Sequence, residues 1–121
     1  MAFWYLNAAA LITSLGAVFH GYIGGKVYLS KIYRSDLETR TRSLSVVAWQ
    51  MFTIWLAVGA ATFICIGLDP SLALMGYPII AANAIGALFF LYLGVTGHAH
   101  LLKLPGAYLM GLTALLGYLG V

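Results

Sequence analysis

The sequence predicts an all-α integral membrane protein, an antiparallel four-helix bundle. Three observations predict it: an apolar composition, four long uncharged tracts, and basic residues confined to two loops. Hydrophobic residues make up 63% of the 121-residue chain and charged residues 7%, where a soluble domain carries about 25% charged residues. A chain this short exposes much of its surface, so it cannot hide such a composition from water. Lipid is therefore the expected solvent, and residues 1–121 are expected to form a single transmembrane domain.

Charged positions divide the chain into four apolar tracts, which cover 1–25, 43–68, 70–102 and 104–121. A spanning helix needs about 20 residues. Proline is tolerated in the first turn of a helix, so Pro78 and Pro105 indicate where the last two helices begin. We expect helices at about 3–29, 43–67, 77–97 and 105–121. The tracts lack the alternating pattern of a transmembrane barrel, and four strands would not close one.

The positions of the basic residues predict the orientation. Five of the six Lys and Arg residues lie in or beside the loop at 26–42, and the sixth, Lys103, lies in the loop at 98–104. With four helices these loops share one face, which the positive-inside rule makes cytoplasmic, with both termini outside. The simplest interpretation of these charges is a topology signal that also attracts anionic lipids, so no nucleic acid partner is expected.

An internal similarity supports an alternative description as two parallel two-helix repeats. The segment LGAVFHGYIG at 15–24 resembles IGALFFLYLG at 85–94, and both would lie on helices that run in the same direction. The competing explanation is chance similarity between helices built from few residue types. Small residues allow close helix contacts in lipid, and the glycines expected to do so are Gly16, Gly21, Gly24, Gly25, Gly86 and Gly94.

Several polar residues lie within the apolar tracts. Thr53 and Asn83 are expected to form hydrogen bonds between helices, and Thr13 lies on a stripe of small and polar residues expected to face inward or toward another copy. His20 and Gln50 lie at similar depth on neighbouring helices, and an ionisable residue inside a membrane is a functional candidate. The two residues are therefore a candidate cofactor-binding site. We favour the simpler interpretation, in which a neutral His20 packs the helices together through a hydrogen bond to Gln50, Tyr22 or a backbone carbonyl.

His98 and His100 form a candidate metal site at the inner end of the third helix. Zinc and copper sites use three or four ligands, and the chain offers no cysteine and few carboxylates at this depth. We therefore favour interfacial histidines over a metal site. The sequence contains no recognisable catalytic set, and it requires no cofactor.

Four short motifs carry a resemblance to known proteins: FHGYIGG at 19–25, YRSDL at 33–37, Trp49-Gln50 and Leu104-Pro105. In these the chain resembles a group of small four-helix bacterial inner-membrane proteins that have no assigned function. Those proteins often have Trp-His where this chain has Trp49-Gln50, which removes a second histidine level with His20. The resemblance implies a location in the bacterial inner (cytoplasmic) membrane and no activity.

These observations lead to one main functional hypothesis and two alternatives. The main hypothesis is a non-enzymatic accessory subunit that packs against other helices, either as a homo-oligomer or within a larger membrane complex. The first alternative is a small oligomeric channel or carrier lined by Thr13, His20, Gln50 and Asn83. The second is a redox component that binds haem or a metal through its histidines.

Overall fold

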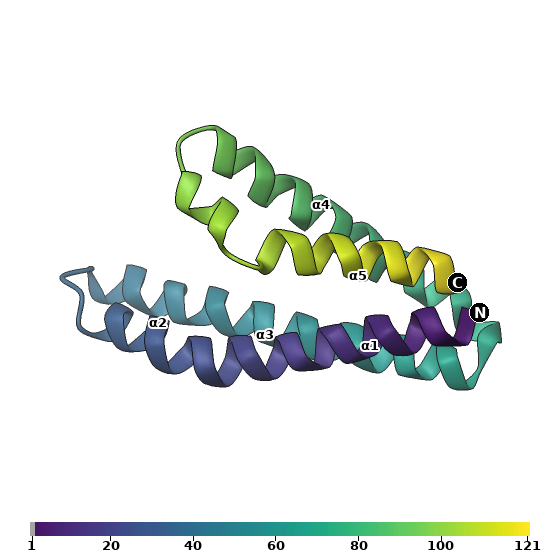
Figure 1. Ribbon diagram of the computed structural model, residues 1–121. Coiled ribbons are helices and arrows are strands. Elements are labelled where there is room, and N and C mark those ends of the chain that lie inside the picture. Colours follow the sequence, from purple (N-terminus) through teal and green to yellow (C-terminus); the bar gives the residue numbers. More distant parts are fainter. Residues whose placement is uncertain (1) are drawn as a thin grey trace.

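The chain folds into helices joined by short turns, and the computed structural model describes residues 2–121 (Figure 1). The segments are α1 (Ala2–Val18), η1 (Phe19–Gly24), α2 (Gly25–Tyr33), α3 (Thr39–Leu68), η2 (Pro70–Met75), α4 (Gly76–Val95), η3 (Ala99–Lys103) and α5 (Gly106–Gly120). The first three form one continuous helix in which η1 is a π-helical turn, whereas η2 and η3 are short 3-10 helices. Residues 2–121 contain no strand, so the prediction of an all-α fold with four main helices is confirmed.

The first two helices extend further into the basic loop than their apolar tracts do. The first ends at Tyr33 and the second begins at Thr39, whereas the tracts indicated about 29 and 43. The length of an apolar tract predicts only the part of a helix that a membrane can bury. The helix itself continues through polar residues until the chain turns, so its ends lie beyond the tract. That turn is held by the Arg42 guanidinium, which donates to the carbonyl oxygens of Ser35 at 2.9 Å and Leu37 at 3.0 Å.

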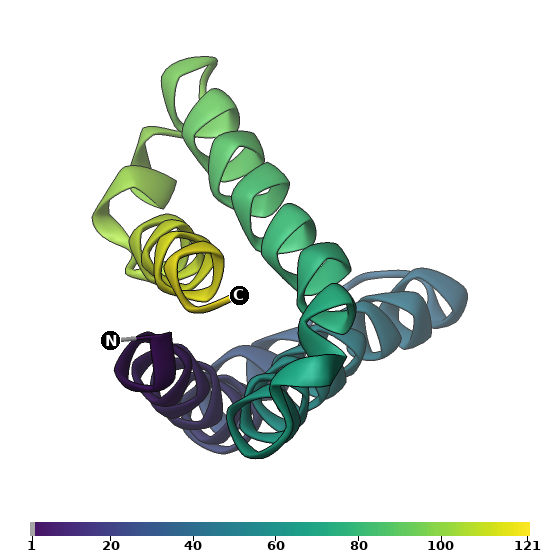
Figure 2. The ribbon, with the colours of Figure 1, turned by 90° about the vertical axis from the view of Figure 1, so that its right-hand side faces the viewer.

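The helices form two antiparallel hairpins that lie close together at one end of the molecule. The continuous helix α1–α2 pairs with α3, and α4 pairs with α5. The hairpins meet mainly through α1 and α5, whereas α3 and α4 contact each other much less. Figure 2 shows α4 leaving the end of α3 and diverging from it, while α5 returns beside α1. The two described ends of the chain lie close together (Figure 1).

The buried core lies in the half of the molecule that contains the chain ends. Phe63 is fully buried there among small and branched side chains from all four main helices, namely Leu6, Ala9, Ala10, Ile66, Ile79, Ile80 and Ala114. Glycines allow this packing, since a Cβ atom at Gly117 would lie 2.8 Å from the Phe63 ring and one at Gly120 would lie 2.7 Å from Leu6 Cγ. This half is therefore closed, and the hairpins separate in the other half.

The two segments of the internal similarity occupy corresponding places in their hairpins. Gly16 lies opposite Leu56 on α3, and Gly86 lies opposite Met110 on α5, so each contacts the second helix of its own hairpin. The contacts between hairpins differ, however, because α1 packs closely on α5 and α4 packs only weakly on α3. The arrangement therefore departs from two-fold symmetry.

Three helical stretches are long and apolar enough to cross a membrane, namely Ala2–Tyr33, Thr39–Leu68 and Pro70–Val95. The fourth, Gly106–Gly120, is apolar but shorter. At ~1.5 Å per residue it covers roughly 22 Å.

Candidate functional site

A cavity of about 560 Å³ lies between the two hairpins, in the half where they diverge. All four main helices contribute to its lining, and most of the lining side chains are apolar or aromatic. They include Ile12, Phe19, Tyr28, Ala48, Trp49, Phe52, Leu56, Phe90, Leu109 and Met110. Ligand sites in proteins have this size and character, with a few polar groups that orient the ligand.

Three polar side chains lie at the inner end of this cavity, toward the packed core. Thr13, Asn83 and Thr113 come from three different helices, and each is only 2% exposed. This end of the cavity lies next to the core, since Thr113 immediately precedes the core residue Ala114. We call this group the polar floor of the cavity.

The polar floor is only partly satisfied by the protein. The Thr13 hydroxyl donates to the Ala9 carbonyl, and the Asn83 amide nitrogen donates to the Ile79 carbonyl at 2.9 Å. The Asn83 side-chain oxygen and the Thr113 hydroxyl have no hydrogen bond within the described residues, but neither is sealed off, since Arg42 Nε is the only fully buried side-chain atom without a partner in residues 2–121. Both groups can therefore be reached from the cavity, where a ligand can form hydrogen bonds with them.

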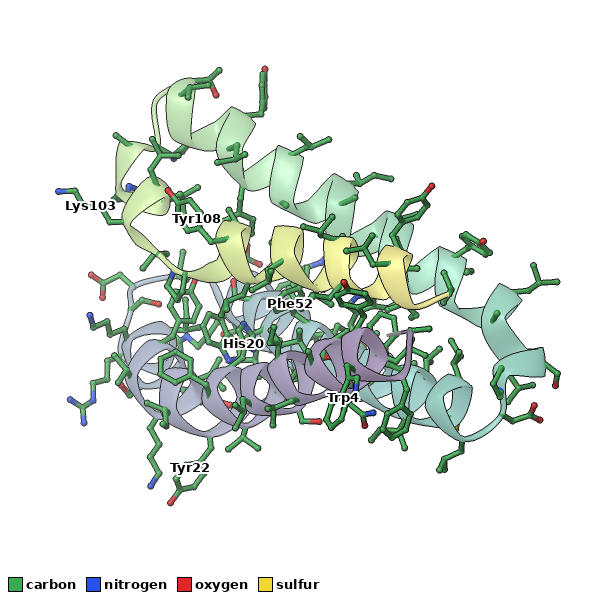
Figure 3. The ribbon with its side chains drawn as sticks, turned by 45° about the vertical axis from the view of Figure 1, so that its right-hand side comes forward. Trp4, His20, Tyr22, Phe52, Lys103 and Tyr108 are labelled. Atoms are coloured by element: carbon green, nitrogen blue, oxygen red, sulfur yellow. The ribbon has the colours of Figure 1, made fainter. Side chains whose placement is uncertain are left out.

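His20 lies nearer the open end, on the π-helical turn η1. Its Nδ1 is 2.9 Å from the Thr53 hydroxyl on α3. Its ring stacks on the Trp49 indole with centroids 3.9 Å apart and meets the Phe52 ring edge-on at 4.9 Å. Figure 3 shows His20 and Phe52 between the hairpins, while Tyr22 points away from them. The π-helix is a feature often found at functional sites.

Trp49 holds the π-helical turn against α3. Its indole N–H donates to the His20 carbonyl at 3.2 Å, and that same carbonyl also accepts the backbone N–H of Gly25. The Tyr28 ring stacks on the indole as well, with centroids 4.3 Å apart. Three aromatic rings from two helices thus build one wall of the cavity.

Gly21 and Gly24 explain how the backbone of η1 comes so close to α3. A Cβ atom at Gly21 would lie 2.6 Å from Thr53 Cγ2, and one at Gly24 would lie 3.0 Å from Trp49 Cζ2. A Cβ atom at Gly25 would meet nothing closer than 3.8 Å. The first two glycines are therefore required by the contact, and the third is not. Of the other predicted packing glycines, Gly86 and Gly94 leave space for Met110 and Leu102.

The structure does not bring Gln50 to His20. The Gln50 side chain is exposed on the outer surface of α3, and Thr53 takes the place beside the imidazole that the sequence offered to Gln50 or Tyr22. Tyr22 instead accepts a hydrogen bond from the Lys26 ammonium group at 2.7 Å. Residues three apart on a helix point in directions that differ by about 60° around its axis. Gln50 and Thr53 lie at similar positions along α3, so position along the axis could not show which of them faces His20.

His98 and His100 are exposed, with ring centroids 6.1 Å apart. Across residues 2–121, no group of three or more His, Cys, Asp or Glu side chains is close enough to hold a metal ion. Among the described residues that line the cavity, His20 is the only histidine, so a haem there would have no second axial histidine. The donor atoms present therefore do not fit a metal or haem site.

Sequence reasoning missed Thr113, Trp49, Phe52 and Tyr28 as lining residues. The sequence carried one usable signal, the Trp49 that accompanies His20 in the resemblance motifs. Carboxylate, lysine, arginine and cysteine side chains are absent from the lining, and the Thr53 hydroxyl beside His20 does not reach the cavity. The arrangement is thus equipped for binding through shape and a few hydrogen bonds. Comparisons with protein-family models, curated proteins and solved structures give no match to this chain.

Proposed function

We propose that the chain is an integral membrane protein that crosses the bilayer four times. Large apolar side chains are exposed along every main helix, among them Leu15, Ile54, Leu88 and Leu115. Soluble monomers rarely expose contiguous apolar patches above a few hundred Å², so lipid is the environment that suits this surface. The fourth helix is short, but Leu104 and Pro105 extend its apolar stretch toward the interface.

The proposed orientation places the basic end in the cytoplasm. Lys103 lies at the end of the molecule away from Trp4 (Figure 3), and the loop at 34–38 is at that same end (Figure 1). The positive-inside rule then puts both termini outside. The sequence resemblance to bacterial inner-membrane proteins favours the bacterial inner membrane as the location, and the positive-inside rule applies to that membrane.

Within that membrane, we propose a non-enzymatic binding protein for a small apolar ligand. The cavity between the hairpins carries this proposal, since it joins about 560 Å³ of apolar volume to a partly unsatisfied polar floor. A dry apolar cavity of about 150 Å³ binds one benzene molecule. By that measure the cavity has room for about twenty carbon-sized atoms, more than a solvent molecule and less than a whole phospholipid.

The channel hypothesis receives less support than binding. A pore needs a polar path across the whole bilayer, but the packed core around Phe63 fills the half beyond the polar floor. Gln50, one of its four proposed lining residues, lies on the outer surface. Within residues 2–121, the cavity therefore ends at the packed core and does not continue across the molecule.

Filling the cavity tests the binding proposal. A Cβ atom at Gly16 would meet only the Leu56 methyl groups, at 3.8 Å, so Gly16→Leu fits locally and extends into the cavity. We expect an apolar compound to co-purify with the wild type from native membranes in near-stoichiometric amount and to be lost in Gly16→Leu. Mass spectrometry of the organic extract measures this.

The matched control is Gly67→Leu, because nothing lies within 4 Å of the Cβ position at Gly67 on α3. This variant should retain the compound. Circular dichroism and an unfolding curve establish that both variants are folded. Equal amounts of the compound in the wild type and in a folded Gly16→Leu protein would contradict the proposal.

A second candidate function is self-association or assembly with another membrane subunit. The exposed Gln50 favours this function. A polar amide on an apolar surface is stabilised when it forms a hydrogen bond with a partner helix. Small exposed residues, Ala57 and Ala61, follow on the same helix and allow close approach. This function is compatible with ligand binding, since Gln50 is not among the residues that line the cavity.

A further inference from the structure

The cavity is about as long as one leaflet of a bilayer is thick. On α3 its lining runs from Ser45 to Leu56, an interval that covers roughly 16 Å along the axis at ~1.5 Å per residue. It extends at least as far along the first helix, from Ile12 to Tyr28. The hydrocarbon core of a membrane is about 30 Å thick, so a lipid chain in one leaflet spans about 15 Å. A single extended acyl chain therefore matches the cavity in length.

The volume of the cavity also corresponds to one chain. Its 560 Å³ have room for about twenty carbon-sized atoms, on the measure of the benzene-sized cavity used above. A long-chain fatty acid has about this many atoms, whereas two chains joined to a headgroup have far more. Length and volume thus agree on a single chain.

The inner end of the cavity suits the end of such a chain. The Thr13 hydroxyl and the Asn83 amide nitrogen already donate to carbonyl oxygens of their own helices. An apolar group can therefore lie against the polar floor without breaking either hydrogen bond. Beyond the floor, the packed core around Phe63 closes the molecule, so a chain that enters from the open end stops here.

The open end of the cavity faces the basic end of the molecule. On three of the segments that line it, a cation lies within one helical turn beyond the last lining residue: Lys31 after Tyr28, Arg42 before Ser45, and Lys103 before Leu104. The two carboxylates of this end, Asp36 and Glu38, are outnumbered by its six Lys and Arg residues. Basic groups at the membrane surface attract anionic headgroups, so this end favours a ligand with a negative charge.

A chain can reach the cavity from the side of the molecule. The helices α3 and α4 contact each other much less than the two helices of either hairpin do, and Figure 2 shows α4 diverging from α3. Such sparse contact gives a lipid-borne chain a lateral route between these two helices. The occupant can therefore come directly from the surrounding leaflet.

We infer, on the basis of the binding function proposed above, that the ligand is a single acyl chain with an anionic headgroup, as in a long-chain fatty acid. The chain lies along the cavity with its methyl end at the polar floor. The carboxylate lies at the open end, near Lys31, Arg42 and Lys103. A fatty alcohol fills the same volume without the charge, and a two-chain phospholipid exceeds that volume.

A competition between chain-matched compounds tests this inference. The probes are hexadecanoate, hexadecanol and dihexadecanoyl phosphatidylglycerol, mixed in equal amounts with purified protein in a non-ionic detergent at low salt. Native mass spectrometry separates the complexes by mass. A cation near an anionic group at a membrane surface strengthens binding by a factor of about five, so hexadecanoate should bind at least about fivefold more tightly than hexadecanol. Salt screens exposed charges, so this preference should fall at high salt.

Charge variants locate the headgroup. Lys31→Gln and Lys103→Gln should each reduce the preference for hexadecanoate over hexadecanol several-fold. Lys26→Gln is the matched control, because the Lys26 ammonium group donates to the hydroxyl of Tyr22, which points away from the hairpins (Figure 3). An equal reduction in all three variants would overturn the position of the headgroup.

Two variants at the inner end locate the chain. Gly16→Leu fills the part of the cavity opposite Leu56, so a shorter chain should fit better. The bound ratio of dodecanoate to hexadecanoate should therefore rise several-fold over that of the wild type. Thr113→Val replaces a hydroxyl by a methyl group and should leave hexadecanoate binding unchanged. A loss of binding in Thr113→Val would show that the ligand carries a polar group at its inner end, and would overturn the inference.

The possible results separate this inference from the function beneath it. Equal binding of hexadecanoate and hexadecanol, with both reduced by Gly16→Leu, would overturn the anionic class and leave apolar binding in place. Preferred binding of the phosphatidylglycerol would overturn the single chain. If Gly16→Leu reduces the binding of none of the probes, the binding function itself is wrong. The comparison of ligands on the wild type needs no variant, so a variant that fails to fold does not prevent a decision.

Discussion

At the scale of single residues, the segment FHGYIGG at 19–25 is explained by its contact with α3. Gly21 and Gly24 allow the helix backbone to approach Thr53 and Trp49, and the Trp49 indole then donates to the His20 carbonyl. The sequence singled out His20 and these glycines. It did not identify Thr53 as the partner of the imidazole, because a residue's position along the helix axis does not give its direction around the helix.

Gly21 gives a prediction at this scale. In Gly21→Ala the new Cβ atom would lie 2.6 Å from Thr53 Cγ2, and such overpacking typically costs about 1–3 kcal/mol. We expect the free energy of unfolding, measured by denaturant titration in detergent, to fall by that amount. The contact is specific, so Gly21→Ala combined with Thr53→Ser, which removes Cγ2 and keeps the hydroxyl, should recover most of the loss. Gly67→Ala, with open space around it, is the control. Additive losses in the double variant would contradict the assigned contact.

At the scale of elements, the connection between the hairpins is held by the side chain of Asp69. Its carboxylate accepts hydrogen bonds from the Ser71 hydroxyl at 2.7 Å and the Ser71 backbone N–H at 3.0 Å, just before η2. Pro70 follows in the first turn, where its missing N–H costs nothing. The hydrogen bonds from Ser71, the hydroxyl first, lower the pKa of Asp69 below its ordinary value.

This lowered pKa predicts a pH dependence. A carboxyl whose folded pKa is below its unfolded value stabilises the fold above the unfolded pKa, and that stabilisation is lost as the pH falls through the folded pKa. For Asp69 the loss occurs below about pH 4. We therefore expect the wild type to lose stability relative to Asp69→Asn, which accepts the same hydrogen bonds at every pH, when unfolding is compared at pH 7 and pH 3. A difference between the two proteins that does not change with pH would exclude this role.

At the scale of the whole molecule, the two hairpins are joined in one half and separated in the other. Buried side chains from every main helix fill the closed half around Phe63, while the open half holds the cavity. Away from the basic loops, the outer surface is mainly apolar, with isolated polar groups such as Gln50. The proposed ligand site and the proposed self-association face therefore lie on different surfaces.

Gln50 allows these two roles to be tested separately. If a second copy covers this face of α3, Gln50→Leu should lower the molar mass of the protein in mild detergent, measured by light scattering, from an oligomer toward a monomer. Ligand content should stay unchanged because Gln50 does not line the cavity. Thr62→Val, which alters another exposed polar residue of α3 that already bonds to its own helix, is the control. A wild type that is monomeric in detergent and in lipid nanodiscs would remove the case for self-association.

The sequence alone determined that this chain forms four apolar helices, where each begins within about one turn, and that its basic residues gather at one end. These properties follow from local composition, because charges, prolines and the length of each tract limit where a helix can lie. Which face of each helix packs inward was decided only by tertiary structure. A helix that is apolar on all sides carries no stripe that marks its buried face, so the choice depends on how individual glycines fit individual partners, such as Gly21 with Thr53 and Gly86 with Met110. The cavity and its polar floor exist because those fits close one half of the molecule and leave the other open.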